Sequence, residues 1–261
     1  MDYLVTEKKL SHAKACRILK LSRNSRYYQK RLPAKDAIVK QAIEKVLPGC
    51  RKGRRKVIVL VQKSHPQIGA SRIRRVYTQG GFSLFKRPSG RKIKAKANPL
   101  PVCLEAHQEW AIDYMSDALT DKRCFRVLNI IDHYSRYCIA SHAGHSIPAR
   151  RLIEYLEQAI QLYKKPLRIR TDNGPEFTSK RFQLWLKKHG IEWQQIEPGC
   201  PQQNACIERF NRTLREDALD ANLFSSIAQA QEIIDDIRKE YNEIRPHESL
   251  NDQPPITLMA A

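Results

Sequence analysis

Residues 108–261 carry strand-like and helix-like patterns in a definite order, and this order constrains the fold more than any other feature. Three strand-like runs come first. The later segments alternate between the 3.6-residue period of a helix and the two-residue period of a strand. A meander of strands followed by βα units is typical of a mixed sheet with helices on its faces. We therefore expect an α/β domain with a mixed five-stranded sheet flanked by helices.

The same patterns give approximate bounds for each element. Strands are expected at 108–116, 124–132, 137–141, in a short run that ends at Asp172, and at 191–196. Helices are expected at 151–163, 179–190, 203–218 and 226–245.

Positive charge is concentrated in the first hundred residues. Lys and Arg outnumber Asp and Glu by 27 to 4 in residues 1–100, whereas the ratio is 20 to 23 in residues 101–261, which together give the net charge of +20. A segment with this excess repels itself unless a polyanion neutralises it, and nucleic acid is the usual polyanion. We expect the first hundred residues to bind nucleic acid. An ordinary charged surface and RNA binding are the alternatives that charge alone leaves open.

The sequence offers no membrane anchor and no cysteine framework. Its longest apolar run is VIVLV at 57–61, far shorter than a bilayer requires, and the first ten residues lack the apolar stretch of a signal peptide. The seven cysteines form no Cys-x-x-Cys pair, which argues against a zinc ribbon or a disulfide scaffold. We expect a soluble intracellular protein without a membrane partner.

Residues 10–31 have the spacing of a helix-turn-helix. Ser11 can cap a first short helix, and Ser22 or Asn24 can cap a second. A helical hairpin with a basic solvent face gives the same pattern and stays open as an alternative. We expect a DNA-binding segment at 1–34, whose presumed recognition helix carries Arg23, Arg26 and Tyr28.

A second helical unit is expected at 35–85. One helix pattern covers 36–47, a basic stretch follows at 50–56, and another helical pattern at 69–82 carries three arginines that could reach phosphates, Arg72, Arg74 and Arg75. Residues 86–101 combine Pro, Gly and Lys without apolar periodicity, which is typical of a flexible basic linker. The remaining segment, 102–261, is the expected α/β domain.

Three carboxylates in this domain stand out. Asp113 lies in the middle of an apolar strand, where a carboxylate is costly unless it is paired or binds a metal. Asp172 opens the sequence Asp-Asn-Gly-Pro behind a strand, which fits a turn as well as a metal ligand. Glu208 lies on the polar stripe of a helix, where a solvated surface role is the usual one. Fifty-eight residues separate the first pair and 35 the second.

Other acidic residues could replace members of this trio. Asp117, Asp121 and Asp132 are alternatives to Asp113, but the first two are expected in the turn after the strand and the third at the end of the second strand, where turn duty suffices. Glu176 is the alternative to Glu208 and is expected in the turn after Asp172.

Several separated motifs, in order, resemble one known family. They are EWAIDYMSD at 109–117, DHYSR at 132–136, TDNGPEF at 171–177, PGCPQQNACIERFNRTLRE at 198–216 and YNEIRPHESLNDQPP at 241–255. An Asp in a first strand, Asp-Asn-Gly after a fourth strand and a Glu 35 residues later resemble the catalytic core of retroviral integrases and insertion-sequence transposases. More narrowly, the chain resembles the OrfB-type transposases of the two-frame bacterial insertion sequences, over nearly its whole length.

This resemblance implies a ribonuclease-H-like fold and a DNA transposase that cuts and joins the ends of its element. Two Mg²⁺ ions, with Mn²⁺ as an alternative, would be held by three carboxylates, with Asp113 bridging both ions and Asp172 and Glu208 each favouring one. Asn173 and Gly174 would shape the loop beside Asp172. Arg215 would contact DNA phosphate, and an ion pair near Glu216 or Asp217 is the alternative for it.

The resemblance also implies partners. They are double-stranded DNA, as the element's terminal repeats and as target, further copies of the chain on that DNA, and a protein from the upstream reading frame. The expected location is the bacterial cytoplasm, in association with the nucleoid. A non-catalytic, sequence-specific DNA-binding regulator that keeps the same fold is the alternative function.

Overall fold

The computed structural model describes residues 2–20, 32–48, 52–84, 103–197 and 200–259. Two short helices come first, α1 (Asp2–Thr6) and α2 (His12–Ile18). Ser11 caps α2 as expected, because its side chain accepts a hydrogen bond from the backbone N–H of Lys14 at 3.4 Å. The expected second helix, with Arg23, Arg26 and Tyr28, lies outside the described residues, so the helix-turn-helix stays a prediction.

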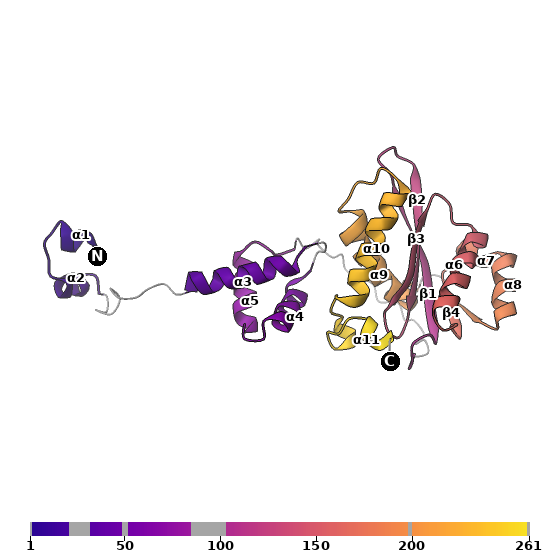
Figure 1. Ribbon diagram of the computed structural model, residues 1–261, viewed down its shortest axis with the longest axis horizontal. Helices are drawn as coiled ribbons and strands as arrows, with labels where there is room; N and C mark the ends of the chain where they lie inside the picture. The colour runs from indigo at the N-terminus through magenta and orange to yellow at the C-terminus, as the bar shows by residue number, and fades with distance from the viewer. Residues whose placement is uncertain (1, 21–31, 49–51, 85–102, 198–199, 260–261) are drawn as a thin grey trace.

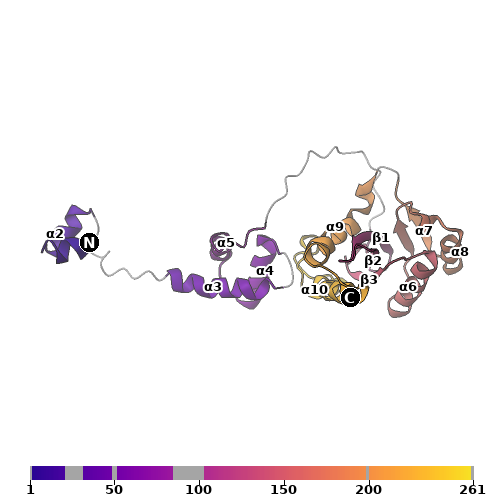
Figure 2. The ribbon, with the colours of Figure 1, turned by 90° about the horizontal axis from the view of Figure 1, so that it is seen from above.

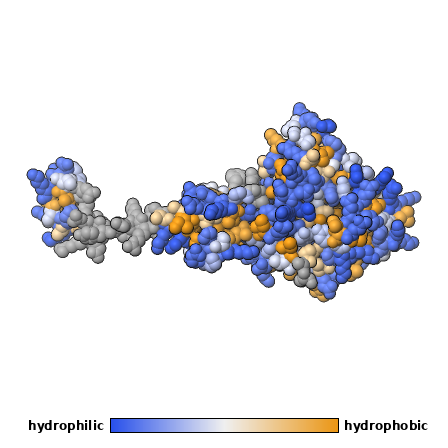
Figure 3. Space-filling model, viewed as in Figure 1, coloured by the Kyte–Doolittle hydropathy of each residue, from blue (hydrophilic) through white to orange (hydrophobic). Residues whose placement is uncertain are grey.

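Three helices form a separate packed unit, which we call the helical unit: α3 (Leu32–Val46), α4 (Arg54–Ser64) and α5 (Ala70–Gln79). Their buried side chains, among them Ile43, Val61 and Ile73, make one core. On the face seen in Figure 3, apolar residues show among hydrophilic ones over this unit, where Ile38 is exposed.

The sequence analysis missed α4 and placed only a basic stretch and an apolar run there. Val57 and Val61 lie one helical turn apart and are buried against α3 and α5, so tertiary packing overrides the strand preference of a β-branched run. The helix α3 begins at Leu32, a few residues before the expected start of this unit at 35.

Five strands form one mixed sheet in the order β3-β2-β1-β4-β5, as predicted (Figure 1). The pairs β1–β2 and β2–β3 are antiparallel, whereas β1–β4 and β4–β5 are parallel. The strands are β1 (Glu109–Ala118), β2 (Cys124–Asp132), β3 (Cys138–Gly144), β4 (Arg168–Thr171) and β5 (Glu192–Gln195).

Helices cover both faces of the sheet and complete what we call the sheet domain, residues 103–259 (Figures 1 and 2). One core packs α6 (Ala149–Leu162), α7 (Pro175–Thr178) and α8 (Lys180–His189) on the face of Trp110 and Ile112. The other packs α9 (Ala205–Leu214) and α10 (Ile227–Glu243) on the face of Met115. A 3₁₀ helix at Pro201–Asn204 precedes α9, and the tail holds another at Glu248–Leu250 and α11 (Ile256–Met259).

Two expected boundaries in the sheet domain are wrong. The first strand runs on to Ala118, so Asp117 lies within β1, opposite Phe125, and not in the following turn. The expected helix 203–218 is divided, because α9 ends at Leu214 and Arg215–Leu219 form a π-helical turn. Among the described residues, no helix has the length and apolar character needed to cross a membrane.

Candidate active site

Asp113 and Asp172 lie at the same level on neighbouring parallel strands. Ala111 of β1 pairs with Arg170 of β4, and each aspartate comes two residues later. Adjacent strands are about 4.8 Å apart, and residues with the same offset point to the same face. The register therefore brings two carboxylates together at the carboxyl end of β4.

The helix α9 brings Glu208 to the same place. Asn211, one turn beyond Glu208, donates a hydrogen bond from Nδ2 to Oδ2 of Asp113 at 2.8 Å, which fixes the polar side of α9 against β1. Ile207, Phe210 and Leu214 bury the opposite side of the helix in the core. Glu208 itself is exposed.

Two further side chains hold Asn211 in place. Asn129 of β2, fully buried, donates to Oδ1 of Asn211 at 2.8 Å, and Ser141 of β3 donates to Oδ1 of Asn129 at 2.8 Å. Asp113 thus ends a chain of hydrogen bonds that crosses three strands and a helix. The sequence analysis assigned no role to Asn211 or Asn129. The available signal was Asn129 in the apolar run VLNIID, since a buried amide needs partners.

The three carboxylates repel one another electrostatically. Burial raises the pKa of Asp113 to about 6, and the charges of Asp172 and Glu208 raise it further, against the hydrogen bonds from the Tyr114 N–H and from Asn211. Within the described part of the chain, none of the three forms an ion pair with Lys, Arg or His. Hard carboxylate oxygens that converge without a basic partner fit a divalent cation such as Mg²⁺.

The loop after β4 holds Asp172 in a defined orientation. Its Oδ1 accepts a hydrogen bond from the Gly174 N–H at 3.0 Å, so the turn role expected from the sequence is present. Asn173 donates to the carbonyl oxygen of Ile196 at 3.4 Å. A Cβ atom at position 174 would lie 3.0 Å from Oδ1 of Asp172, which explains why a glycine stands there.

The alternative aspartates have structural partners. Asp132 is fully buried, and its carboxylate accepts hydrogen bonds from the Ser135 N–H, the Ser135 hydroxyl and the His107 N–H, each at 2.7 Å. Asp121 accepts from the side chain of Arg123 at 2.7 Å. These two carboxylates have the turn roles expected of them.

Glu176 and Asp117 pair with arginines. Glu176 forms an ion pair with Arg126, whose guanidinium lies 4.1 Å from the centre of the Tyr114 ring. Asp117 lies 3.8 Å from Arg215. The free carboxylates and the paired ones therefore divide along the lines expected from the sequence, although Asp117 is in the strand.

Arg215 binds within the sheet domain. It donates to the carbonyl oxygen of Ser116 at 2.7 Å and lies 3.8 Å from both Asp117 and Asp220. The expected ion pair near Glu216 or Asp217 is therefore not the one observed, and Asp217 pairs with Arg245 instead. In α5, Arg74 is exposed and Arg72 half-buried, while Arg75 pairs with Asp36 at 2.7 Å.

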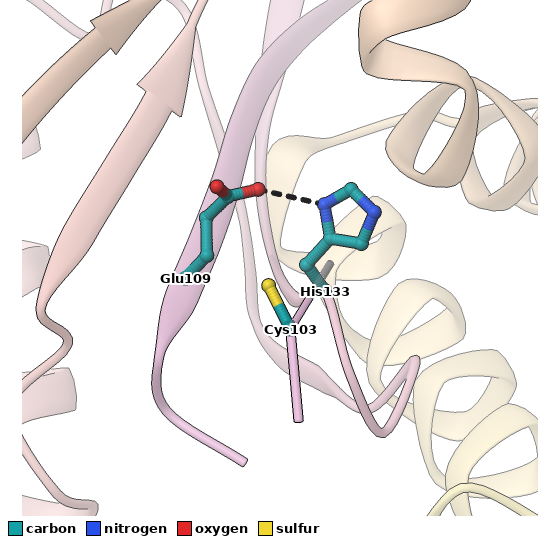
Figure 4. A group of neighbouring side chains, drawn as sticks. All are labelled: Cys103, Glu109 and His133. Atoms are coloured by element: carbon teal, nitrogen blue, oxygen red, sulfur yellow. Dashed lines mark hydrogen bonds and ion pairs between the residues drawn. The ribbon is translucent and has the colours of Figure 1, made fainter. Parts of the chain in front are cut away.

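A second group of metal-ligand types lies at the start of β1, formed by Cys103, Glu109 and His133 (Figure 4). Glu109 is fully buried, and its carboxylate lies 2.7 Å from Nδ1 of His133, 2.6 Å from Arg170 and 3.3 Å from Arg168. Burial would raise the pKa of Glu109, but His133 and Arg170 lower it overall. Because two guanidinium groups already neutralise this carboxylate, a cation would meet repulsion there.

Known proteins resemble the chain in both sequence and fold. Two family models, each described as an integrase core domain, match residues 104–201 and 189–255. An uncharacterized 39.2 kDa protein of insertion element IS476 from Xanthomonas euvesicatoria is 35% identical over 257 residues, which cover 96% of this chain and 73% of that protein. The transposase InsF of insertion sequence IS3A from Escherichia coli is 28% identical over 145 residues, which cover 54% of this chain and 50% of InsF.

The fold has a counterpart among solved structures. A chain of the simian T-cell lymphotropic virus intasome in complex with PP2A regulatory subunit B56 gamma aligns with a TM-score of 0.54 and 16% identity. The alignment covers 80% of this chain and 71% of that chain. At this identity the likeness shows the fold alone, the ribonuclease-H-like sheet of an integrase core.

Proposed function

This chain belongs to the OrfB-type insertion-sequence transposases with an integrase core domain, and from that premise we propose that it catalyses metal-dependent cleavage and strand transfer of its element's DNA ends. One observation carries the proposal. Asp113, Asp172 and Glu208 converge where β1, β4 and α9 meet, and within the described chain none of them has a basic partner.

Each carboxylate has a distinct task in this proposal. Asp113 would hold both of two Mg²⁺ ions, or Mn²⁺ in their place, while Asp172 and Glu208 would each hold one. Bound there, the two ions activate the attacking hydroxyl or water and stabilise the leaving oxygen of the phosphodiester. Asn211 keeps Asp113 oriented by its hydrogen bond, and the Gly174 N–H does the same for Asp172. Glu208 is exposed and can turn toward a ligand.

The DNA contacts come from outside the carboxylate site in this proposal. Double-stranded DNA, as terminal repeats and as target, would be selected by Arg23, Arg26 and Tyr28, because base contacts specify a sequence and phosphate contacts only position it. Arg72, Arg74, Arg75 and Arg215 would contact phosphates. Several copies of the chain would act together on the DNA, with a protein from the upstream frame as a further partner.

Strand transfer with variant proteins tests the carboxylate assignment. Asp113→Asn, Asp172→Asn and Glu208→Gln each keep the side-chain size and remove one negative charge. Each should lower strand transfer of pre-cut element ends in Mg²⁺ by more than about 100-fold, the upper loss typical of groups that only support metal ligands. DNA binding should persist. Asp113→Asn with Glu208→Gln should be scarcely worse than either alone, because residues of one metal site are not additive.

The same assay separates enzyme from regulator. A wild-type chain that selects element ends yet neither cuts nor joins them in Mg²⁺ or Mn²⁺, alone or with the upstream-frame protein, would favour a non-catalytic DNA-binding regulator. Full activity in any one of the three variants would show that the catalytic carboxylates are assigned wrongly.

A further inference from the structure

A large cavity of about 1250 Å³ lies between the helical unit and the sheet domain. The start of α4 forms one wall, and α9, the β2–β3 turn and residues 246–258 form the others. Two ion pairs hold these parts together, Lys52 with Glu240 at 3.1 Å and Arg55 with Asp252 at 3.2 Å. The volume exceeds the roughly 300–1,000 Å³ of ordinary small-molecule sites, so the cavity has room for part of a macromolecule.

Positive charge dominates the lining. Six Lys and Arg residues line the cavity against two acidic ones, Glu248 and Asp252, and Arg55 pairs with both of these. The cationic side chains other than Arg55 are Arg54, Lys56, Arg136, Arg170 and Arg209.

Several of these cations lack an anionic partner. Within the described residues, Arg54, Arg136 and Arg209 form no ion pair, and Arg54 and Arg209 are exposed. Burial lowers the pKa of Lys56 to about 8, and the charge of Arg245 lowers it further, against the acidic groups nearby. Positive charges crowded to this degree indicate a place for an anion that the chain does not itself supply.

Two kinds of N–H donor in the cavity are suited to an anion. Gly53 caps α4 without a side-chain hydrogen bond, and the first backbone N–H groups of a helix have no partner within it, so this end attracts phosphate. Arg170 is only 1% exposed, and its buried Nε–H has no hydrogen-bond acceptor among the described residues. The second observation is independent of the first, because Arg170 belongs to the sheet domain.

The cavity adjoins the carboxylate site through α9. At 100° per residue, Arg209 points to a different side of α9 from Asn211, which contacts Asp113, and it lies next to Glu208 in the chain. A polyanion bound in the cavity is therefore about one helical turn from the scissile phosphate of the proposed reaction. DNA carries such charges continuously, one per about 1.7 Å of duplex, whereas an acidic protein segment has no reason to lie beside the carboxylate site.

We infer that this basic cavity binds backbone phosphates of the DNA that flanks the reacting bond, with Arg54 and Arg209 as contacts from opposite walls. The inference rests on the proposed function insofar as the DNA is the transposase's substrate. It adds a contact that joins the helical unit to the sheet domain across bound DNA.

Salt-dependent binding of full-length protein to duplex DNA tests this inference. Arg54→Gln and Arg209→Gln should each flatten the fall of log K with log salt by about 0.9 and raise Kd by about eightfold at 0.1 M salt, the value for one lost phosphate contact. The double variant should show both losses. Arg181→Gln is the matched control, because Arg181 is exposed on α8 on the other face of the sheet and forms no ion pair in the described chain.

Each outcome decides between the occupants. Unchanged Kd and slope in the double variant, with melting temperature unchanged, would overturn the inference and leave the proposed function standing. Loss of binding to polyglutamate but not to DNA would overturn it in favour of an acidic protein segment. Competition by millimolar inorganic phosphate as strong as that by duplex DNA would show a site for free phosphate and overturn it too. A wild-type chain that binds no DNA at any salt would remove the proposed function as well.

Discussion

Glu109 and Asp113 lie four residues apart in the same strand, about 13 Å along it, and on the same face of the sheet. Their surroundings are opposite. Glu109 is fully buried with His133, Arg168 and Arg170 around it, and its pKa is lowered. Asp113 has amide and backbone donors but no cation, and its pKa is raised to about 6.

The difference separates a carboxylate that serves the fold from one that serves a ligand. Burying a charge is costly, and the chain offsets that cost for Glu109 with its own arginines. For Asp113 the compensation is left out, although the chain has 47 Lys and Arg residues. A site left short of positive charge in so basic a protein is prepared for a cation from outside.

Replacing each carboxylate by its amide should break this comparison most strongly. Glu109→Gln leaves Arg170 buried without its counter-charge, so we expect a loss of about 3–5 kcal/mol in the free energy of unfolding. Asp113→Asn should cost nothing or stabilise, because it relieves repulsion in the metal-free protein. Urea unfolding in the presence of a chelator measures both. Equal destabilisation by the two variants would contradict the division into structural and ligand carboxylates.

The pH dependence of stability should differ in sign for Asp113 from the usual case of an acid. Folding raises its pKa from 3.8 to about 6, so between these values the folded chain holds a proton that the unfolded chain has released. Stability of the metal-free protein should therefore fall, by at most about 3 kcal/mol, as the pH rises from about 4 to 6, and level off above. The difference between wild type and Asp113→Asn, followed across this range, isolates the effect. A flat difference would show that Asp113 titrates normally.

Much of the carboxylate site was predictable because it depends on local periodicity. Alternation in β1 placed Asp113 opposite Trp110 and Ile112, and the helical stripe placed Glu208 beside the buried side of α9. Parallel pairing of β1 with β4 then aligns Asp113 with Asp172, which follows from the βα connection.

What the sequence could not supply depends on contacts between distant segments. Asn211 and Asn129 are 82 positions apart, and no periodicity indicates that they meet. Lys52 and Glu240 likewise join only through the packing of two separate units. The helix α4 was missed because β-branched residues in a row resemble a strand until their neighbours are known.

Asn211 offers a sharper comparison, because it is the only side-chain donor to Asp113 among the described residues. Its hydrogen bond lowers the pKa of Asp113, against the effect of burial. Asn211→Ala should therefore raise that pKa further and weaken Mg²⁺ binding by about 10- to 100-fold, as for other groups that orient a metal ligand. Calorimetry measures the affinity, and the pH profile of strand transfer should shift upward. Asn222→Ala is the matched control, since Asn222 donates to the Ala218 carbonyl away from the site.

Glu176 gives the smallest expected effect and sets the limit of the comparison. It lies near Asp172 in the chain, yet it pairs with Arg126 and so belongs with Glu109 among the structural carboxylates. The pair is partly exposed, so Glu176→Gln should cost only about 1 kcal/mol in the free energy of unfolding, between the values for surface and buried pairs. Strand transfer should remain substantial. A double-mutant cycle with Arg126→Gln measures the pair itself. Complete loss of strand transfer in Glu176→Gln, with Glu208→Gln still active, would move Glu176 into the catalytic set and Glu208 out of it.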